Sequence, residues 1–271
     1  AKQARIRHFD IDPSEINKNG KVDVAVVGNC KQTLQRVTEL VEPARHQAWV
    51  DGFKPYEDKE DYKVIQPAIH PTEGPLLMGE VVRAVSEATA HKAILVTDVG
   101  QNQMCGCRDF QVSEARSVVT SGGCGTVGFG LPAAIGATFG APERTVCMFC
   151  GDGGLQMTIQ ELGTIMEQQS PVKIILLNNN FLGNVRQWQY MFFQKRYSFT
   201  PMLNPDYEQI SAAYGIPSRT VIDRADLNDA ISEMLSTDGP FLLQCAIKEE
   251  DNVLPMTPPG ASVDEMLLDI K

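Results

Sequence analysis

The sequence is short of basic residues, with 24 lysines and arginines against 34 aspartates and glutamates and a formal net charge of −10. Nucleic acids and anionic membrane surfaces attract proteins with a surplus of Lys and Arg. Neither nucleic acid nor a membrane is therefore expected as a partner. Aromatic residues are also scarce, at 7% of 271 residues, but a hydrophobic content of 43% is sufficient for a buried core. The composition indicates a globular protein.

The chain also lacks long apolar runs: none approaches the roughly 20 residues that a membrane-spanning helix requires. The opening segment, Ala1-Lys2-Gln3-Ala4-Arg5, has no apolar core of the kind found in a secretory signal. Seven cysteines are an odd number in a chain too long to depend on disulfides, which favours free thiols and a reducing compartment. We therefore expect a soluble, cytoplasmic protein.

The pattern along the chain predicts four parts. Residues 1–48 show strand patterns at 6–9 and 22–27 and an amphipathic helix at 31–41. A unit of this size cannot cover both faces of a parallel sheet, so we interpret it as the end of a central, Rossmann-like α/β domain. The chain opens without an initiator Met, and we expect truncation or processing upstream. Residues 49–75, interrupted by prolines, are predicted to be a linker, 76–248 the main domain and 249–271 a C-terminal tail.

The main domain alternates apolar strand-like segments with helical patterns. Continuous apolar strands separated by helices are typical of a parallel sheet covered by helices on both faces, with ligands bound at the carboxyl ends of the strands. The predicted fold class is therefore α/β. Strands are expected at 93–97, 145–149, 173–177 and 241–247, and helices at 77–89, 131–139, 159–166, 207–214 and 227–235.

Two polar motifs follow two consecutive predicted strands. Gly151-Asp152-Gly153-Gly154 follows the strand at 145–149, and Asn178-Asn179-Asn180 begins 26 residues after Asp152. A strand-helix-strand unit of this length would bring Asp152 and Asn179 to the same edge of the sheet, where a carboxylate, an amide oxygen and a carbonyl can bind Mg²⁺. Glycines allow main-chain N–H groups to approach phosphates, towards which the next helix directs its positive end. Gly-Asp-Gly alone is usually an ordinary turn; the second motif at this spacing favours a metal-diphosphate site.

The two motifs together, Gly151-Asp152-Gly153 through Asn178-Asn179, resemble the signature of thiamine diphosphate-dependent enzymes. Other segments narrow the resemblance to the large catalytic subunits of acetolactate (acetohydroxyacid) synthases, and to their carboxy-terminal half. The resemblance covers nearly the whole chain. The segments that carry it are 121–136 (SGGCGTVGFGLPAAIG), 171–179 (PVKIILLNN), 182–189 (LGNVRQWQ) and 255–260 (PMTPPG).

The resemblance implies the thiamine diphosphate-binding fold and a transferase activity. Such an enzyme decarboxylates pyruvate and condenses the two-carbon unit with a second 2-oxo acid, pyruvate or 2-oxobutanoate, in branched-chain amino acid biosynthesis. The implied cofactors are thiamine diphosphate and Mg²⁺, with FAD possible in the full-length protein. The family's catalytic glutamate comes from an amino-terminal domain of the partner subunit. No segment here resembles that domain, so no catalytic residue is assigned and the chain alone is expected to be inactive.

The resemblance also implies which residues bind the cofactor. Mg²⁺ would be bound by the side chains of Asp152 and Asn179 and by the carbonyl oxygen of Phe181. Six further residues would line the diphosphate: Gln101, Asn102, Gly153, Gly154, Leu182 and Gly183.

The remaining implied positions face the reactive end of the cofactor. Gly125 and Val127 would lie beside the aminopyrimidine, and Asn184 and Trp188 would shape the substrate pocket. Trp188 has an equally good alternative as a core residue of a helix. Asn102, Val127 and Asn184 depart from the usual His, Met and Met of the family. Asn102 can still bind phosphate and Val127 can still press on the ring, whereas Asn184 places a polar group near the reacting carbon and bears on substrate preference.

Two other functions remain open on sequence alone. One is another thiamine diphosphate-dependent 2-oxo acid decarboxylase, which would release an aldehyde; Gln187-Trp188-Gln189 and the tail disfavour it. The other is a non-catalytic cofactor-binding module. The partners expected from the resemblance are small 2-oxo acids, further copies of the subunit in a homodimer or homotetramer, and a separate regulatory subunit.

Overall fold

The structure is a computed structural model that describes residues 4–262 and 265–270. The chain divides into two compact units, one up to Lys54 and one from Pro55 onward. Each unit is described by itself.

The first unit is a small parallel β-α arrangement. Strands β1 (Arg7–Asp10) and β2 (Val24–Val27) pair in parallel, and helices α1 (Cys30–Leu40) and α2 (Gln47–Asp51) follow. Asn29 caps α1 by accepting a hydrogen bond from the N–H of Lys31. None of the residues that the structure describes in this unit is buried. The predicted strands and helix are present, and the assignment to a second, Rossmann-like domain stays a prediction.

The proline-rich segment before the main sheet is more regular than the sequence suggested. It is helical through α3 (Lys54–Glu60), a π-helical turn (Asp61–Ile65) and α4 (Gln66–Ile69). Pro55 is the second residue of α3, where a missing N–H removes no intrahelical hydrogen bond. Pro67 is the second residue of α4, which directly follows the π-helical turn. Val64 and Ile69 are buried, and α4 packs on the first helix of the main domain. The sequence predicted that prolines interrupt regular structure here, but Pro55 and Pro67 lie within helices.

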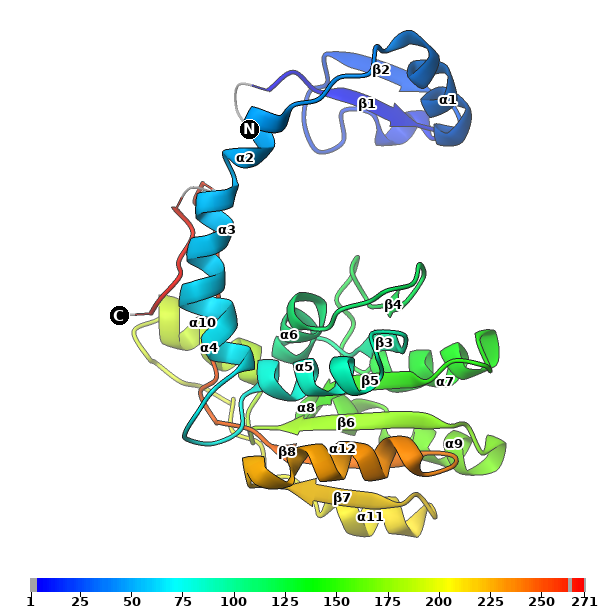
Figure 1. Cartoon of the computed structure of the whole chain (residues 1–271), viewed down its shortest axis with the longest axis vertical. Coiled ribbons are helices and arrows are strands. Elements are labelled where there is room, and N and C mark those ends of the chain that lie inside the picture. The colour runs from blue at the N-terminus through cyan, green and yellow to red at the C-terminus, as the bar shows by residue number, and fades with distance from the viewer. Residues whose placement is uncertain (1–3, 263–264, 271) are drawn as a thin grey trace. The chain divides into compact units, whose positions relative to one another are not determined.

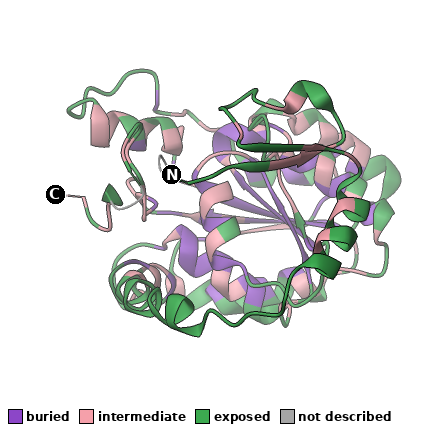
Figure 2. Ribbon diagram, turned by 90° about the horizontal axis from the view of Figure 1, so that it is seen from above, coloured by how far each residue is buried: buried purple, intermediate pink, exposed green. Residues whose placement is uncertain are grey.

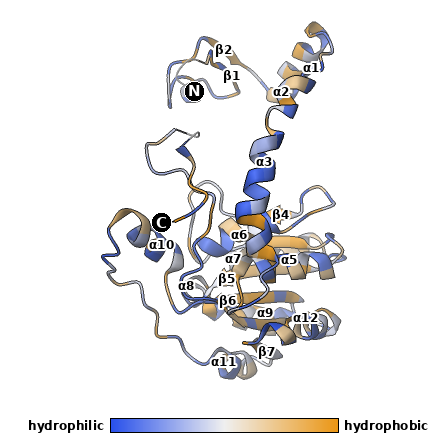
Figure 3. Ribbon diagram, turned by 60° about the vertical axis from the view of Figure 1, so that its left-hand side comes forward, coloured by the Kyte–Doolittle hydropathy of each residue, from blue (hydrophilic) through white to orange (hydrophobic). Residues whose placement is uncertain are grey.

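The second unit is built on a six-stranded sheet in which every strand pair is parallel (Figure 1). The two central strands are formed by nearly continuous apolar residues and are buried along almost their whole length. Figure 3 shows the contrast between these hydrophobic strands and the hydrophilic helix α3. The strand order is β4 (Val118–Val119), β3 (Ile94–Thr97), β5 (Val146–Gly151), β6 (Val172–Asn178), β8 (Phe241–Ala246) and β7 (Ser218–Val221).

Helices cover both faces of this sheet, and alternate strand residues point into two separate cores. In β5, Cys147 and Phe149 belong to one core, and Val146 and Met148 belong to the other. Figure 2 shows the buried strands between their surrounding helices. The predicted α/β fold class is confirmed. One face carries α5 (Met78–Ala88), α6 (Gln101–Asp109) and α12 (Leu227–Ser236), and the other carries α7 (Gly130–Gly140), α9 (Leu162–Gln168) and α11 (Tyr207–Ala213).

The strand order creates a switch point between β3 and β5. From β3 the chain moves outward to β4 and then returns to the other side of β3 as β5. At such a point two loops diverge from the carboxyl edge of a parallel sheet, and ligands bind between them. Three helices begin close to this edge: α6 follows β3, α8 (Asp152–Met157) follows β5, and α10 (Gly183–Phe192) follows β6.

Candidate functional site

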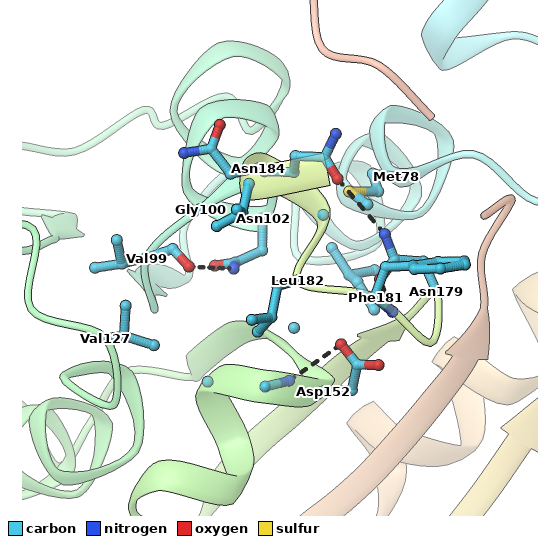
Figure 4. A pocket seen from close by; sticks show the side chains of 17 residues that line it. Met78, Val99, Gly100, Asn102, Val127, Asp152, Asn179, Phe181, Leu182 and Asn184 are labelled. Atoms are coloured by element: carbon cyan, nitrogen blue, oxygen red, sulfur yellow. Dashed lines mark hydrogen bonds between the residues drawn. The ribbon is translucent and has the colours of Figure 1, made fainter. Parts of the chain in front are cut away.

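A pocket lies at the carboxyl ends of β3, β5 and β6 (Figure 4). All residues expected to bind the diphosphate or the metal line it. Asp152 and Asn179 thus meet in one pocket, as the spacing of the two motifs predicted. The lining consists of Met78, Val99, Gly100, Gln101, Asn102, Val127, Gly151, Asp152, Gly153, Gly154, Leu177, Asn179, Phe181, Leu182, Gly183, Asn184 and Val185.

Asp152 directly follows β5 and begins α8, with 1% of its surface exposed. Its Oδ1 accepts a hydrogen bond from the N–H of Gly153 at 3.1 Å, and its Oδ2 accepts one from Asn204 Nδ2 at 2.7 Å. Burial raises the pKa of the Asp152 carboxyl, and the hydrogen bonds from Asn204 and Gly153 act in the opposite direction. Among the described residues that line the pocket, Asp152 is the one ionisable side chain.

Asn179 and Phe181 lie on the loop that follows β6. Asn179 is 3% exposed, and its Oδ1 accepts a hydrogen bond from the N–H of Phe181 at 3.3 Å. The Nδ2 of Asn179 lies 3.5 Å from Oε1 of Gln101, the first residue of α6. Asn180, between Asn179 and Phe181, has a φ of 60°, a left-handed conformation. The loop therefore presents an amide side chain and main-chain carbonyls near Asp152.

Close packing requires three of the five glycines that line the pocket, Gly153, Gly154 and Gly183. A Cβ on Gly154 would lie 2.4 Å from Oδ1 of Asp98, and a Cβ on Gly183 would lie 2.0 Å from Oε1 of Gln101. A Cβ on Gly153 would lie 2.7 Å from Cδ2 of Leu182. No larger residue fits at these positions without displacing its neighbours, so the main chain itself forms the wall of the pocket.

Three helices, α6, α8 and α10, begin at the pocket. In the part of the chain that the structure describes, none of the three has a side-chain hydrogen bond at its N-cap. N–H groups in the first turn of a helix have no intrahelical partner, and the helix dipole places partial positive charge there. The arrangement suits an anion with several oxygens, such as a diphosphate.

Two buried polar atoms at the pocket have no partner within the described chain. They are the side-chain oxygens of Asn102 and Asn184, both of which belong to lining residues. Buried polar groups in proteins are nearly always hydrogen-bonded, and an orphaned one indicates a missing water or ligand. The oxygens of Asp152, Asn179 and the Phe181 carbonyl, together with the glycine wall, fit a metal-bound diphosphate. The two orphaned amide oxygens accept hydrogen bonds and therefore fit a donor, such as a metal-bound water, rather than a phosphate oxygen.

Only some of the residues expected at the reactive end of the cofactor line the pocket. Val127 lines the pocket, with 39% of its surface exposed, and lies far from Asp152 in Figure 4. Gly125 is not part of the lining. A Cβ at Gly125 would lie 3.9 Å from Cγ1 of Val99, and Val99 is a lining residue. Trp188 lies outside the lining, is 38% exposed and packs edge-to-face on Phe192 with ring centroids 5.3 Å apart. Its role at a substrate pocket stays a prediction.

Sequence reasoning missed residues that hold the site in place. Asp98 is fully buried directly after β3, and its carboxylate accepts hydrogen bonds from the N–H groups of Gly128 and Gly130. Asp98 thereby attaches to the sheet the loop that contains Val127. The sequence feature that could have identified Asp98 is its position directly after a predicted apolar strand. Asn204 was missed as well, and no local pattern marks it.

Two further features are absent from residues 4–262 and 265–270. No three His, Cys, Asp or Glu side chains gather there, as a metal site built only from these residue types would require. No helix in the same residues is both long and apolar enough to cross a membrane.

The chain is similar in sequence to large subunits of acetolactate synthase. It is 39% identical over 270 residues to the acetolactate synthase isozyme 2 large subunit of Escherichia coli (strain K12), covering 98% of this chain and 47% of that protein. It is 38% identical over 274 residues to the large subunit of Parasynechococcus marenigrum, covering 98% of this chain and 43% of that protein. For the large subunit of Lactococcus lactis the identity is 35% over 269 residues, with 98% and 46% covered. The chain spans less than half the length of these relatives.

A family match covers most of the sheet and nearly all of the pocket. Residues 98–245 match the family described as thiamine pyrophosphate enzyme, C-terminal TPP binding domain. The matched segment begins at Asp98, directly after β3, and ends at Cys245, within β8. Every lining residue except Met78 falls inside it. Thiamine pyrophosphate is thiamine diphosphate by another name, and the chain therefore belongs to the thiamine pyrophosphate enzymes, whose C-terminal cofactor-binding domain it carries.

Proposed function

We propose that this chain is the cofactor-binding half of an acetolactate synthase. The whole enzyme would decarboxylate pyruvate and join the two-carbon unit to a second 2-oxo acid, pyruvate or 2-oxobutanoate, in branched-chain amino acid biosynthesis. The observation that carries the proposal is the convergence of Asp152, Asn179 and three uncapped helix N-termini on one glycine-walled pocket. The identity of 35–39% to acetolactate synthase large subunits supports the choice within the family.

In this proposal the metal end of the cofactor is bound between β5 and β6. Asp152 and Asn179 would bind Mg²⁺ through side-chain oxygens and Phe181 through its carbonyl oxygen, since Mg²⁺ prefers hard oxygen ligands. The cation would also favour the charged form of Asp152, against the effect of burial. The main chain at Gly153, Gly154, Leu182 and Gly183 would line the diphosphate, with Gln101 and Asn102 opposite.

The reactive end of the cofactor would lie towards Val127, with Gly125 beside it. When bound, thiamine diphosphate supplies the nucleophilic carbon and the electron sink that decarboxylation of a 2-oxo acid requires. The apolar surface of Val127 would orient the aminopyrimidine. Asn184 and Trp188 would bound the space for the second 2-oxo acid, and the helix that carries them would help to exclude water.

A proton donor or acceptor for activation is missing from the described lining of this pocket. Asp152 is its one ionisable residue and is committed to the metal in this proposal. Activation would therefore depend on a glutamate from an upstream domain of a partner subunit, and the working site would form between subunits of a homodimer or homotetramer. A separate regulatory subunit, bound FAD, a cytoplasmic location and the division into residues 1–48, 49–75, 76–248 and 249–271 belong to the same proposal.

The test is a fusion of this chain behind the amino-terminal half of the E. coli isozyme 2 large subunit, the part that the chain does not match. The fusion is supplied with pyruvate, Mg²⁺ and thiamine diphosphate, and the product is identified. Acetolactate, lost on Asp152→Ala, supports the proposal. Acetaldehyde instead would assign the chain to 2-oxo acid decarboxylases. A fusion that binds the cofactor but releases no carbon dioxide would point to a non-catalytic module.

A further inference from the structure

A segment distant in sequence returns to the proposed metal loop. The N–H of Met202 donates to the carbonyl oxygen of Asn180 at 2.8 Å, and the N–H of Leu182 donates to the carbonyl oxygen of Thr200 at 2.8 Å. These bonds form an antiparallel bridge between Phe181 and Pro201. Two residues beyond Met202, the chain places Asn204 beside Asp152.

The amide of Asn204 is held in one orientation. Its Oδ1 accepts a hydrogen bond from Gln156 Nε2 at 2.9 Å and lies 3.1 Å from the hydroxyl of Tyr207. Tyr207 is 2% exposed, and its hydroxyl is a hydrogen-bond donor that lies 3.1 Å from Oδ1 of Asn204 and 3.3 Å from the carbonyl oxygen of Asp152. Because Oδ1 faces these donors, Nδ2 must face the opposite way.

On that opposite side three oxygens surround the nitrogen. Asn204 Nδ2 lies 2.7 Å from Oδ2 of Asp152 and 3.1 Å from the side-chain oxygens of both Asn178 and Asn180. The hydrogen bond to Asp152 is the shortest of the three and is assisted by the charge of the carboxylate. Asn204 therefore links the end of β5 to the loop after β6, the two segments that carry Asp152 and Asn179.

We propose that Asn204 is a positioning residue for the metal site: it holds Oδ2 of Asp152 and so leaves Oδ1 for the cation. Oδ1 accepts a hydrogen bond from the N–H of Gly153 at 3.1 Å, and a carboxylate oxygen can also bind a cation through its second lone pair. Hydrogen-bonding partners behind metal ligands fix their orientation, and their loss weakens metal binding by about 10- to 100-fold. The inference rests on the proposed Mg²⁺ site and adds Asn204, oriented by Gln156 and Tyr207, to it.

The test measures metal affinity rather than turnover. Mn²⁺ is titrated into the chain with saturating thiamine diphosphate and followed by electron paramagnetic resonance. Asn204→Ala is expected to weaken Mn²⁺ binding by about 10-fold or more, and excess Mn²⁺ should restore cofactor binding. Tyr207→Phe, which removes one of the two groups that hold Oδ1 of Asn204, is expected to weaken Mn²⁺ binding by about fivefold, the effect of one hydrogen bond. Asn228→Ala, an exposed asparagine on α12, is the matched control and should change nothing.

The outcomes separate this inference from the proposed function. Asp152→Ala in the same titration should abolish Mn²⁺ binding; binding retained in that variant, or absent from the unsubstituted chain, would overturn the metal site itself. Loss in Asp152→Ala with unchanged affinity in Asn204→Ala would overturn the role of Asn204 alone. Should Asn204→Ala fail to fold, Tyr207→Phe decides: an affinity equal to that of Asn228→Ala overturns the inference.

Discussion

The side-chain amide of Gln187 pairs with the main chain of Val253 as a strand would. Its Nε2 donates to the carbonyl oxygen of Val253 at 2.9 Å, and its Oε1 accepts from the N–H of Val253 at 2.9 Å. The same Oε1 also accepts a hydrogen bond from Gln101 at 2.7 Å. One buried side chain thus joins α10, the start of α6 and the segment after β8.

Replacing Gln187 by Leu should detach this segment. The substitution leaves the N–H and C=O of Val253 and the Nε2 of Gln101 without this partner, and buried unsatisfied groups cost about 1–3 kcal/mol each. We expect a loss of stability of about 2–4 kcal/mol in urea unfolding, with faster hydrogen exchange at Val253. Gln189→Leu on the same helix, whose bonds to Ser198 are exposed, is the control and should cost under about 1 kcal/mol. Equal losses in both variants would contradict the role given to Gln187.

Adding one methyl group at Gly183 should disturb the pocket. Its Cβ would lie 2.0 Å from Oε1 of Gln101 and 2.8 Å from Nδ2 of Asn179. We expect Gly183→Ala to destabilise the chain by about 1–3 kcal/mol, as overpacking does, and to weaken cofactor binding measured by calorimetry. Gly136→Ala, in the middle of α7 with nothing within 4 Å of the added atom, should instead stabilise it by about 0.5–1 kcal/mol. The opposite signs, read from thermal unfolding, are the measurement that checks this.

Ionisation of the buried Asp251 carboxyl should lower the free energy of unfolding as pH rises. Burial raises the pKa of its carboxyl above the ordinary 3.8, and the hydrogen bond from the N–H of Met78 only partly opposes this. A folded-state pKa above the unfolded one means that the contribution is fully present below about pH 4 and is lost as pH rises through the folded pKa. The free energy of unfolding relative to Asp251→Asn should therefore decline from pH 4 upward and level off. A difference that grows with pH over this range would show that the Met78 contact outweighs burial.

The chain supplied alone with pyruvate, Mg²⁺ and thiamine diphosphate should release no carbon dioxide above background. The reason is that the described lining of the pocket offers no acid or base besides Asp152. Cofactor binding, measured in the same preparation, distinguishes an inactive site from an empty one. Turnover by the chain without any upstream half would contradict the proposed site between subunits.

The sheet could be predicted because its central strands are continuous apolar segments, and the pocket because its polar residues directly follow them. Asp152 and Asn179 needed no long-range information beyond the strand-helix-strand unit that joins them. β4 has only two residues, and β7 begins with Ser218 and Arg219, so neither shows the apolar pattern of a strand. Asn204 and Gln187 act through contacts 52 and 66 residues away in sequence, which no local pattern reveals.

The strand order also has a consequence for the timing of folding. The pocket exists only after β3, β5 and β6 have paired, and the pairing of Ile94 with Val146 closes a loop of about 50 residues. Such non-local pairing is slow, and a ligand that needs all three strand ends has nothing to bind before it is complete. A ligand in this pocket is therefore expected to slow unfolding of the finished domain without accelerating the early steps by which the domain folds.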